Sequence, residues 1–475
     1  MTADGSAPRA ELVRGLGLWG AIAVNVANMI GTGVFLKTRV MTCNVGSPVL
    51  VLAVWIAAGL LTLAGTFAYA EVAAMIPEAG GDYVFLRRAY GRLTGFLYGW
   101  TTFAIYKSGS QAALAVGFAI FLNVALGGLL EGDALEGVAF GVPLHLSWLA
   151  VAALAAVWVV AWINCRSVAT GGRTAIVLTG AKVVLLAALA IGAFAFATGH
   201  FAHFSLPATG ATCDGVAASA RGGFAGFGAA MLGALWAYDG WSNVTPLAGE
   251  IRHPARDLPR AFVGGMLVVG ALYLAVNLAY FYVLTPVEVG SVATTSSVAT
   301  EVLRRFVGPA AVTVAAVALM LSAFGSLQAS VLSGARIPFA MAREGLFFRS
   351  LGQVSHRTHV PARAVIAQAA WASVLAVSGS YDTLTDAAIF AVWLFYGLTA
   401  ASLFVFRRTL PDAPRPYRAL GYPLVPAAFI VVTLALLANT FVATPRLALA
   451  GVAIMLAGLP FYLYWSRQPP RVTPP

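Results

Sequence analysis

The stretch that most constrains the fold of this chain is an apolar segment, Leu16–Leu36, which is long enough to cross a lipid bilayer as a helix. Its middle reads Gly31-Thr32-Gly33, and glycine weakens a helix because it has no side chain to restrict or shield the backbone. In hydrocarbon, an unwound turn is tolerated only where its free N–H and C=O groups meet protein, water or a ligand. The tripeptide is therefore either a binding site inside the membrane or a point of close helix packing, which small residues also favour.

Composition extends the membrane assignment to the whole chain. Of the 475 residues, 60% are hydrophobic and 10% are charged, whereas soluble domains carry about 25% charged residues. We therefore expect an all-α integral membrane protein with twelve transmembrane helices. The expected spans cover residues 16–37, 49–75, 94–127, 147–165, 174–198, 223–247, 261–284, 309–335, 363–379, 383–405, 424–443 and 446–465. The first apolar run has no small-residue cleavage pattern after it, so we expect no signal peptide.

The distribution of charge predicts the orientation of these spans. The net charge is +11, and most of the 29 lysines and arginines fall in loops that lie on the cytoplasmic side if the N-terminus is inside. This positive-inside bias predicts a multi-pass protein of the cell (inner) membrane with both termini in the cytoplasm. The basic excess then attracts anionic lipid. No basic patch with interleaved aromatic residues indicates binding to nucleic acid.

Cysteine and histidine residues do not suggest a cofactor or a metal, and we predict neither. All six histidines fall in predicted loops. Cys43 and Cys213 both fall in outer loops, where an oxidising periplasm permits a disulfide, although we expect free thiols.

A second interruption lies in the sixth span, which reads WAYDGWSN from Trp236 to Asn243. An acidic residue, Asp239, stands there beside Gly240. Gly33 and Gly240 occupy corresponding positions, each in the first helix of a five-span unit. Paired interruptions of this kind are typical of inverted-repeat transporters, whose substrate site lies between the broken helices.

Several motifs together resemble those of a known family. They are NMIGTGVF in the first span, YAEVAAMIPEAGGDYVFLRRAYG after the second, AKVVLLAALAI in the fifth, LWAYDGWSNVTPLAGEIRHPARDLPRA across the sixth, and ARIPFAMAREGLF after the eighth. The chain resembles the amino acid–polyamine–organocation (APC) family, and within it the L-type amino acid transporter-like branch. The resemblance covers spans one to eight and implies a LeuT-like 5+5 inverted repeat with broken helices 1 and 6, plus two peripheral helices.

On this pattern the chain is a single transporter domain, 1–475. Its parts are a cytoplasmic arm (1–14), a first five-helix repeat (15–200), a second, inverted repeat (222–406), helices eleven and twelve (423–466) and a cytoplasmic tail (467–475).

The resemblance also implies a substrate site, which its chemistry makes reasonable. The site residues are Met29, Ile30, Gly31, Thr32 and Gly33 in the first span, and Trp236, Ala237, Tyr238, Asp239 and Gly240 in the sixth. An unwound turn exposes N–H groups at a helix N-terminus, which suits the carboxylate of an amino acid. Carbonyl oxygens at the breaks would accept the ammonium group, and Trp236 would close over the substrate on the outer side. Asp239 could attract a cationic side chain, contact the ammonium of any amino acid, or pair with a lysine.

Two lysines fall inside predicted spans, where a charge costs about 2.5–3.5 kcal/mol or more and so marks function. Lys182 aligns with a lysine that replaces a sodium ion in proton-coupled or sodium-independent members of the family. Burial disfavours its charged form, which would let it bind and release a proton. Lys107 is a weaker candidate, which we expect to face the interior and pair with an acid or a carbonyl. Ser322 and Ser326 in the eighth span could instead be ligands of a sodium ion.

These observations predict a secondary active transporter of neutral and/or cationic L-amino acids that works by alternating access, coupled to protons or to exchange and independent of sodium. The alternative within this class is a sodium-coupled amino acid or polyamine symporter. An integral membrane enzyme would need a catalytic constellation inside the spans, yet no histidine lies there and no HExxH or GxSxG motif occurs. A channel would need pore-lining rings from several subunits. Whether the chain is a monomer or a homodimer stays open.

Overall fold

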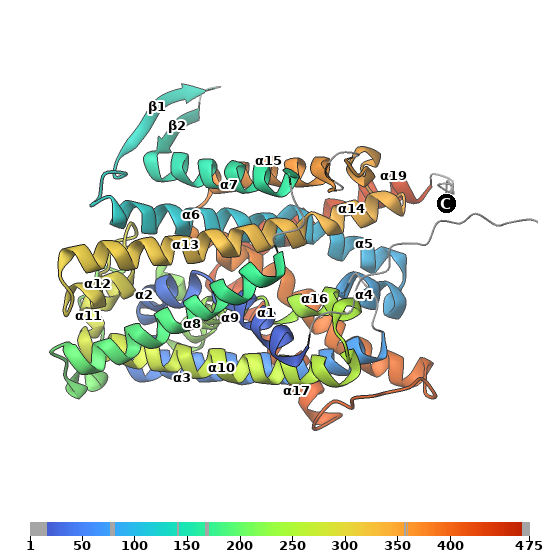
Figure 1. The fold of residues 1–475 in the computed structure, drawn as a ribbon, viewed down its shortest axis with the longest axis horizontal. Helices are drawn as coiled ribbons and strands as arrows, with labels where there is room; N and C mark the ends of the chain where they lie inside the picture. The colour runs from blue at the N-terminus through green and yellow to red at the C-terminus, as the bar shows by residue number, and fades with distance from the viewer. Residues whose placement is uncertain are drawn as a thin grey trace, which may run out of the picture.

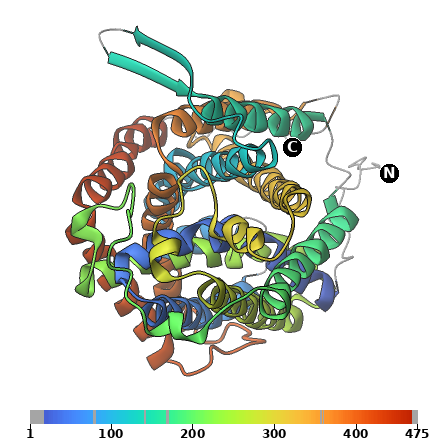
Figure 2. The same ribbon diagram turned by 90° about the vertical axis from the view of Figure 1, so that its left-hand side faces the viewer.

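The computed structural model describes residues 17–76, 81–139, 142–166, 171–355, 358 and 360–467. The predicted arm 1–14 and nearly all of the tail lie outside these residues. The helices run mostly along one common axis (Figure 1), and a view along that axis shows them gathered into a bundle (Figure 2). The described residues therefore confirm the helical membrane architecture that the sequence predicts.

The helices follow the predicted spans closely. In chain order they are α1 (Leu18–Met29), α2 (Gly33–Val45), α3 (Pro48–Met75), α4 (Asp82–Tyr90), α5 (Arg92–Thr101), α6 (Lys107–Ala125), α7 (Trp148–Arg166), α8 (Gly171–Phe196), α9 (Gly223–Tyr238), α10 (Pro254–Val283), α11 (Pro286–Gly290), α12 (Val298–Arg304), α13 (Pro309–Gly334), α14 (Arg336–Arg343), α15 (Ala362–Ser378), α16 (Tyr381–Thr409), α17 (Leu424–Ala443), α18 (Pro445–Leu456) and α19 (Gly458–Ser466). A π-helical turn (Thr102–Tyr106) joins α5 to α6, and short 3₁₀ helices cover Phe201–Ser205, Ala218–Ala220, Trp241–Glu250 and Arg349–Gly352.

Length and hydropathy identify eight membrane-crossing helices in the described part of the chain, or nine if the bent pair α1 and α2 is one span. The segments Gly180–Phe196 and Ala362–Ser378 are apolar but shorter. The chain is thus a multi-pass membrane protein.

The first span is broken at the expected glycines. α1 ends at Met29, α2 begins at Gly33, and the two axes differ by 46°. The sixth span is interrupted at Asp239, where α9 ends and the backbone becomes extended. Gly240 then adopts φ +100°, a left-handed conformation that favours glycine. Beyond it the chain forms the 3₁₀ helix Trp241–Glu250, where we had expected the span to continue to residue 247.

One element departs from an all-helical fold. Strands β1 (Asp133–Ala139) and β2 (Val142–Ser147) form an antiparallel hairpin that projects from the bundle (Figures 1 and 2). The hairpin satisfies the backbone hydrogen-bonding groups of a loop that lies beyond the helices. We call the end of the bundle that carries β1, β2, α11 and α12 the outer end, following the orientation that the charge bias predicts.

The expectation of free thiols at the outer end is wrong. Cys43 of α2 and Cys213 of the loop before α9 form a disulfide, and both side chains are buried. The loop is held on α2 by further bonds, since Asn44 donates its amide to the Ala220 carbonyl (2.6 Å) and the Gly222 N–H donates to the Asn44 carbonyl (2.7 Å). The two cysteines lie 170 residues apart in the chain, so their contact could not be predicted from their positions in the sequence.

A buried ion pair closes the opposite end. Glu71, near the end of α3, is fully buried and accepts two bonds from the Arg407 guanidinium, at 2.9 and 2.6 Å. The backbone N–H of Ala419 also donates to this carboxylate (2.6 Å), and Arg415 Nε lies 3.4 Å from it. The segment between α16 and α17 is thereby fastened to α3.

Candidate functional site

The two helix interruptions border one small, partly enclosed cavity of about 50 Å³. Nine of the predicted residues line it: Met29, Gly31, Thr32, Gly33, Lys107, Trp236, Asp239, Gly240 and Ser326. The sequence did not identify the six other lining residues, four of which are polar: Ala27, Asn28, Ser110, Leu114, Asn243 and Ser330. The cavity therefore combines backbone from the two breaks with side chains of α6 and α13.

The other predicted residues lie behind this lining. Ile30 and Ala237 are buried, and Ser322 is buried on α13, where its hydroxyl has no hydrogen-bond partner among the described residues. Tyr238 points away toward α3 and α10, where its ring contacts Trp55 and Tyr273 edge-on or tilted.

The two interruptions touch each other directly. A Cβ placed on Gly33 would lie 2.6 Å from the Ala237 Cα, and one placed on Gly240 would lie 2.5 Å from the Asn28 carbonyl oxygen. The Gly-Thr-Gly tripeptide is therefore both a break in the helix and a point of close packing, and its role as a binding site stays a prediction. Gly33 and Gly240 permit the contact, whereas Gly31 faces the cavity with only Leu114 near its missing Cβ, at 3.7 Å.

Tyr273 of α10 fixes the carbonyl groups at both breaks. Its buried hydroxyl lies 2.9 Å from the carbonyl oxygen of Met29 and 2.9 Å from that of Ala237. A hydroxyl has one proton to donate, so the two carbonyls share it. Each carbonyl keeps a lone pair for another donor, and the shared bond sets the relative position of the two helices.

Lys182 of α8 reaches the first interruption from behind. Its ammonium lies 2.9 Å from the Ile30 carbonyl oxygen and 2.7 Å from the Ser326 hydroxyl, with the Ala27 carbonyl at 3.5 Å. These oxygens satisfy the buried charge, and they are oxygens of the kind that a sodium ion would use. The Lys182 ammonium therefore joins the break after α1 to Ser326 of α13.

Asp239 is held by tyrosines on two other helices. Its carboxylate accepts the Tyr106 hydroxyl at 2.9 Å and the Tyr396 hydroxyl at 2.9 Å, one bond to each oxygen. Lys107 follows the π-helical turn that carries Tyr106, and its ammonium lies 3.4 Å from the Asn243 side-chain oxygen. Single π-helical turns are frequent at functional sites because they redirect the next side chains. We expected Lys107 to pair with an acid or a carbonyl, and its partner in the structure is the side-chain carbonyl oxygen of Asn243.

Hydrogen bonds cover the cavity where α2 leads from it toward the outer end. The Trp236 indole donates to the Tyr381 hydroxyl (2.9 Å), and this hydroxyl lies 2.8 Å from the Thr32 hydroxyl. Tyr381 begins α16, so it joins both interrupted spans to a third helix.

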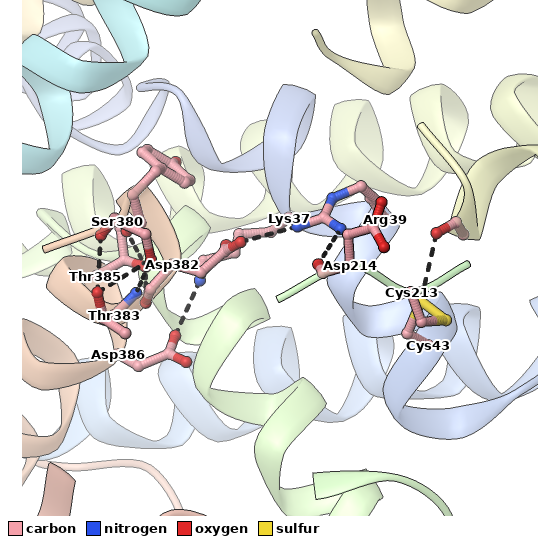
Figure 3. A network of polar contacts seen from close by, with 12 residues as sticks. Lys37, Arg39, Cys43, Cys213, Asp214, Ser380, Asp382, Thr383, Thr385 and Asp386 are labelled. Atoms are coloured by element: carbon pink, nitrogen blue, oxygen red, sulfur yellow. Dashed lines mark hydrogen bonds and ion pairs between the residues drawn. A yellow bond between two sulfur atoms is a disulfide. The ribbon is translucent and has the colours of Figure 1, made fainter. Parts of the chain in front are cut away.

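A network of four charged side chains joins α2 to the first turns of α16 (Figure 3). Lys37, one turn along α2 from Gly33, is fully buried and pairs with Asp382 (3.0 Å) and Asp386 (2.9 Å) of α16. Arg39 pairs with Asp382 (3.1 Å) and donates to the Asp214 carbonyl (2.7 Å), next to the disulfide. The sequence analysis missed this network. Its signal was the pair of aspartates four residues apart at the start of a predicted span, where charged residues indicate function.

A mostly helical membrane protein in which two interrupted helices meet at a polar cavity has the arrangement typical of inverted-repeat transporters. Comparison with known proteins gives the family. The chain belongs to the amino acid permease family, whose model matches residues 16–465. It is accordingly a transporter and not an enzyme.

The relatives are amino acid transporters from bacteria and mammals. A serine/threonine exchanger of Bacillus subtilis is 30% identical over 455 residues, which are 95% of this chain and 96% of the relative. The b(0,+)-type amino acid transporter 1 of Mus musculus is also 30% identical, over 95% of this chain and 88% of its own length. The large neutral amino acids transporter small subunit 2 of Mus musculus is 29% identical, over 96% and 82%.

Proposed function

We propose that this chain exchanges amino acids across the cell membrane by alternating access and without sodium. One observation carries the proposal: both interrupted helices meet at one polar cavity, and Lys182 sits on the carbonyl of the first interruption. The relatives support the reaction, since one is named an exchanger and the others amino acid transporters. The substrate is an L-amino acid whose side chain is neutral and/or cationic.

The head group of the substrate fits the two helix breaks. The first turn of α2 has no side-chain cap, so its free N–H groups, beginning at Gly33, are available to a carboxylate. Thr32 adds a hydroxyl at the same place. The ammonium group is accepted by carbonyl oxygens of the breaks, which Tyr273 holds in position through Met29 and Ala237.

Sodium is excluded in this mechanism because Lys182 uses the oxygens that a sodium ion would need. The hydroxyl of Ser326, a possible sodium ligand, lies 2.7 Å from the Lys182 ammonium. An ammonium and a sodium ion cannot occupy one position, and their charges repel each other. Lys182 is also the group that would carry a coupled proton.

In this proposal the chain has twelve spans, arranged as a 5+5 inverted repeat with two peripheral helices. The eight long apolar helices, the bent pair α1 and α2, the interrupted α9, and the shorter segments Gly180–Phe196 and Ala362–Ser378 together supply twelve. Both termini then lie in the cytoplasm, as the positive-inside bias favours. In this orientation Tyr381 and the ion pairs of Lys37 and Arg39 with α16 lie between the cavity and the outside, so the cavity is closed on that side.

Counterflow in proteoliposomes tests the proposal. Purified protein is reconstituted in sodium-free buffer, and uptake of a labelled amino acid is compared between vesicles loaded with the same unlabelled amino acid and empty vesicles. We expect uptake in the loaded vesicles to exceed that in the empty ones clearly, and to be unchanged by added sodium. Uptake that requires sodium, or that ignores the internal amino acid, would contradict the proposal.

A further inference from the structure

A second hollow lies at the inner end of the bundle and is open to the surface. Its volume is about 610 Å³, and sites for small ligands typically measure about 300–1,000 Å³. It is lined by four aromatic residues, one proline and one arginine: Phe348, Arg349, Pro460, Phe461, Tyr464 and Trp465. These residues belong to α19 and to the stretch that follows α14, and both helices lie at the end opposite the β hairpin (Figure 1).

The hollow lies beside the last turn of a membrane-crossing segment. α18 and α19 together form the apolar segment Pro445–Ser466, of which only 22% is buried in its apolar stretch. Most of this segment therefore faces lipid. It ends at Ser466 and Arg467, and basic residues at the end of a span mark the boundary between membrane and cytoplasm. The hollow is thus at the depth where phospholipid headgroups meet their acyl chains.

Aromatic rings form the floor of the hollow. Trp465 is buried, and its ring lies 5.2 Å from that of Phe348 and 5.5 Å from that of Phe461, measured between centroids. Phe461 in turn stacks on Trp100 of α5 at 4.8 Å. The rings at the rim stay accessible, since Phe348 is 51% exposed and Tyr464 is 64% exposed. Contiguous exposed apolar surface marks an interaction site, and aromatic rings suit the membrane interface because they combine apolar faces with polar edges.

The charge at the hollow is positive. Arg349 is exposed, and the described residues that line the hollow include no acidic side chain. The acidic residue nearest to Arg349 in the sequence, Glu344, is already engaged. Its two oxygens accept the Tyr83 hydroxyl and the Arg87 guanidinium, both at 2.6 Å. A phosphate is a good partner for arginine, whereas the ammonium of a zwitterionic headgroup would lie beside a like charge with no carboxylate to meet it.

We propose that this hollow binds one anionic phospholipid, with its phosphate on Arg349 and its glycerol and acyl chains on the rings of Phe461 and Trp465. Tyr464 adds a hydroxyl that can donate to the phosphate or to an ester oxygen. The basic excess of the chain attracts anionic lipid in general, whereas this site holds one headgroup at a fixed place. The inference is independent of the proposed function, because no residue of the hollow lines the substrate cavity.

Native mass spectrometry of the full chain in detergent tests the site. Phosphatidylglycerol and phosphatidylcholine with the same acyl chains are titrated separately, and the dissociation constant of the first bound lipid is measured. In the wild type we expect phosphatidylglycerol to bind about fivefold more tightly, which is what one arginine near the membrane surface contributes toward an anionic lipid. Arg349→Gln should abolish this preference, and Arg349→Lys should retain it because the charge is kept. Phe348→Ala should weaken the binding of both lipids alike, because apolar contact is lost, so the test survives if the arginine variants do not fold.

Arg408→Gln is the matched control. Arg408 is an exposed arginine in the last turn of α16 and does not line the hollow, so the variant removes the same charge and should leave the ratio of the two dissociation constants unchanged. Equal affinity for the two lipids in the wild type, a preference that survives Arg349→Gln, or an equal loss in Arg408→Gln would each overturn the inference.

The same titrations test other occupants of the hollow. Displacement of phosphatidylglycerol by an equal concentration of inorganic phosphate would show that the apolar part of the lipid contributes nothing, and would overturn the inference. Lipid binding that occurs only in a variant lacking residues 468–475 would assign the hollow to that segment. Loss of the lipid when the protein dimerises would assign it to a second copy of the chain. Each of these results would contradict a lipid site and leave the proposed function unaffected.

Discussion

Gly33 lies directly against Ala237, and the two residues belong to different interrupted helices. The space between them is so small that a Cβ on Gly33 would come within 2.6 Å of the Ala237 Cα. The backbones of the two breaks are therefore in contact, with no side chain between them. Gly33 is therefore needed for packing of the two breaks. Gly31, two residues earlier, instead faces the cavity.

The two glycines of the tripeptide should respond differently to alanine. In Gly33→Ala, backbone has to move, and such overpacking costs about 1–3 kcal/mol or more. We expect this variant to unfold at a lower temperature or to fail to fold. In Gly31→Ala, the new methyl group enters the cavity beside Leu114 without a clash, at 3.7 Å. We expect it to fold normally and to lose roughly tenfold in exchange, as one methylene typically does in a tight pocket. Thermal unfolding in detergent and exchange in proteoliposomes, measured on both variants, check this. Equal behaviour of the two would contradict it.

Lys182→Ala should slow exchange strongly without unfolding the protein. The variant leaves the Ile30 carbonyl and the Ser326 hydroxyl without the ammonium that lies 2.9 and 2.7 Å from them. A hydrogen bond to a charged group contributes about 1.5–3 kcal/mol of stabilising free energy. The break is less firmly held without these bonds, so we expect the rate of exchange to fall tenfold or more. The measurement is counterflow, with size-exclusion chromatography to confirm that the protein is folded. Exchange at the wild-type rate would remove Lys182 from the mechanism.

Sequence could predict the interruptions because glycines and an aspartate inside an apolar span conflict with a continuous buried helix. It could place Lys182 by the same reasoning, since a charge at that depth requires partners. It could not identify what holds Asp239 or Lys37. Their partners lie on helices far along the chain, as in the 345 residues that separate Lys37 from Asp382. Tertiary packing alone brings such residues together, and the tyrosines involved look like ordinary core residues in the sequence.

The charge network of Lys37 should stabilise the closed outer side. Lys37→Met leaves Asp382 and Asp386 near each other without the buried cation between them, and like charges at short range repel. We expect the outer side to open more often. A cysteine introduced as Leu114→Cys in the cavity wall, in a Cys165→Ala background, should then react faster with a membrane-impermeant thiol reagent added outside. Asp386→Asn in the same chain removes one of the two negative charges and should slow the reaction again. Equal reaction rates in all three proteins would show that the network has no part in closure.

The disulfide between Cys43 and Cys213 should stabilise the protein more than it affects transport. It fastens the loop before α9 to α2, and neither cysteine lines the cavity. Native disulfides typically contribute about 2–5 kcal/mol, so Cys43→Ser should unfold at a lower temperature than the wild type, while exchange at moderate temperature changes less than twofold. Reductant should lower the unfolding temperature of the wild type and not that of Cys43→Ser. A variant that keeps its stability but loses exchange would reverse this assignment.

At the inner end, Glu71 should be the most sensitive ion-pair residue in the described part of the chain. Its carboxylate is fully buried and accepts both arms of the Arg407 guanidinium together with the Ala419 N–H. Glu71→Gln keeps the shape but leaves Arg407 without its counter-charge, and breaking a buried pair costs about 3–5 kcal/mol. Arg407→Lys keeps the positive charge but loses the two parallel bonds, because lysine cannot bind both carboxylate oxygens in that geometry.

We therefore expect Glu71→Gln to lower the unfolding temperature more than Arg407→Lys. The double variant should be no less stable than Glu71→Gln alone, since the two residues act as one pair. Thermal unfolding of the four proteins in the same detergent measures this cycle. Effects of the single variants that simply add in the double variant would mean that the two residues stabilise the fold independently, and that the segment between α16 and α17 is held by other contacts.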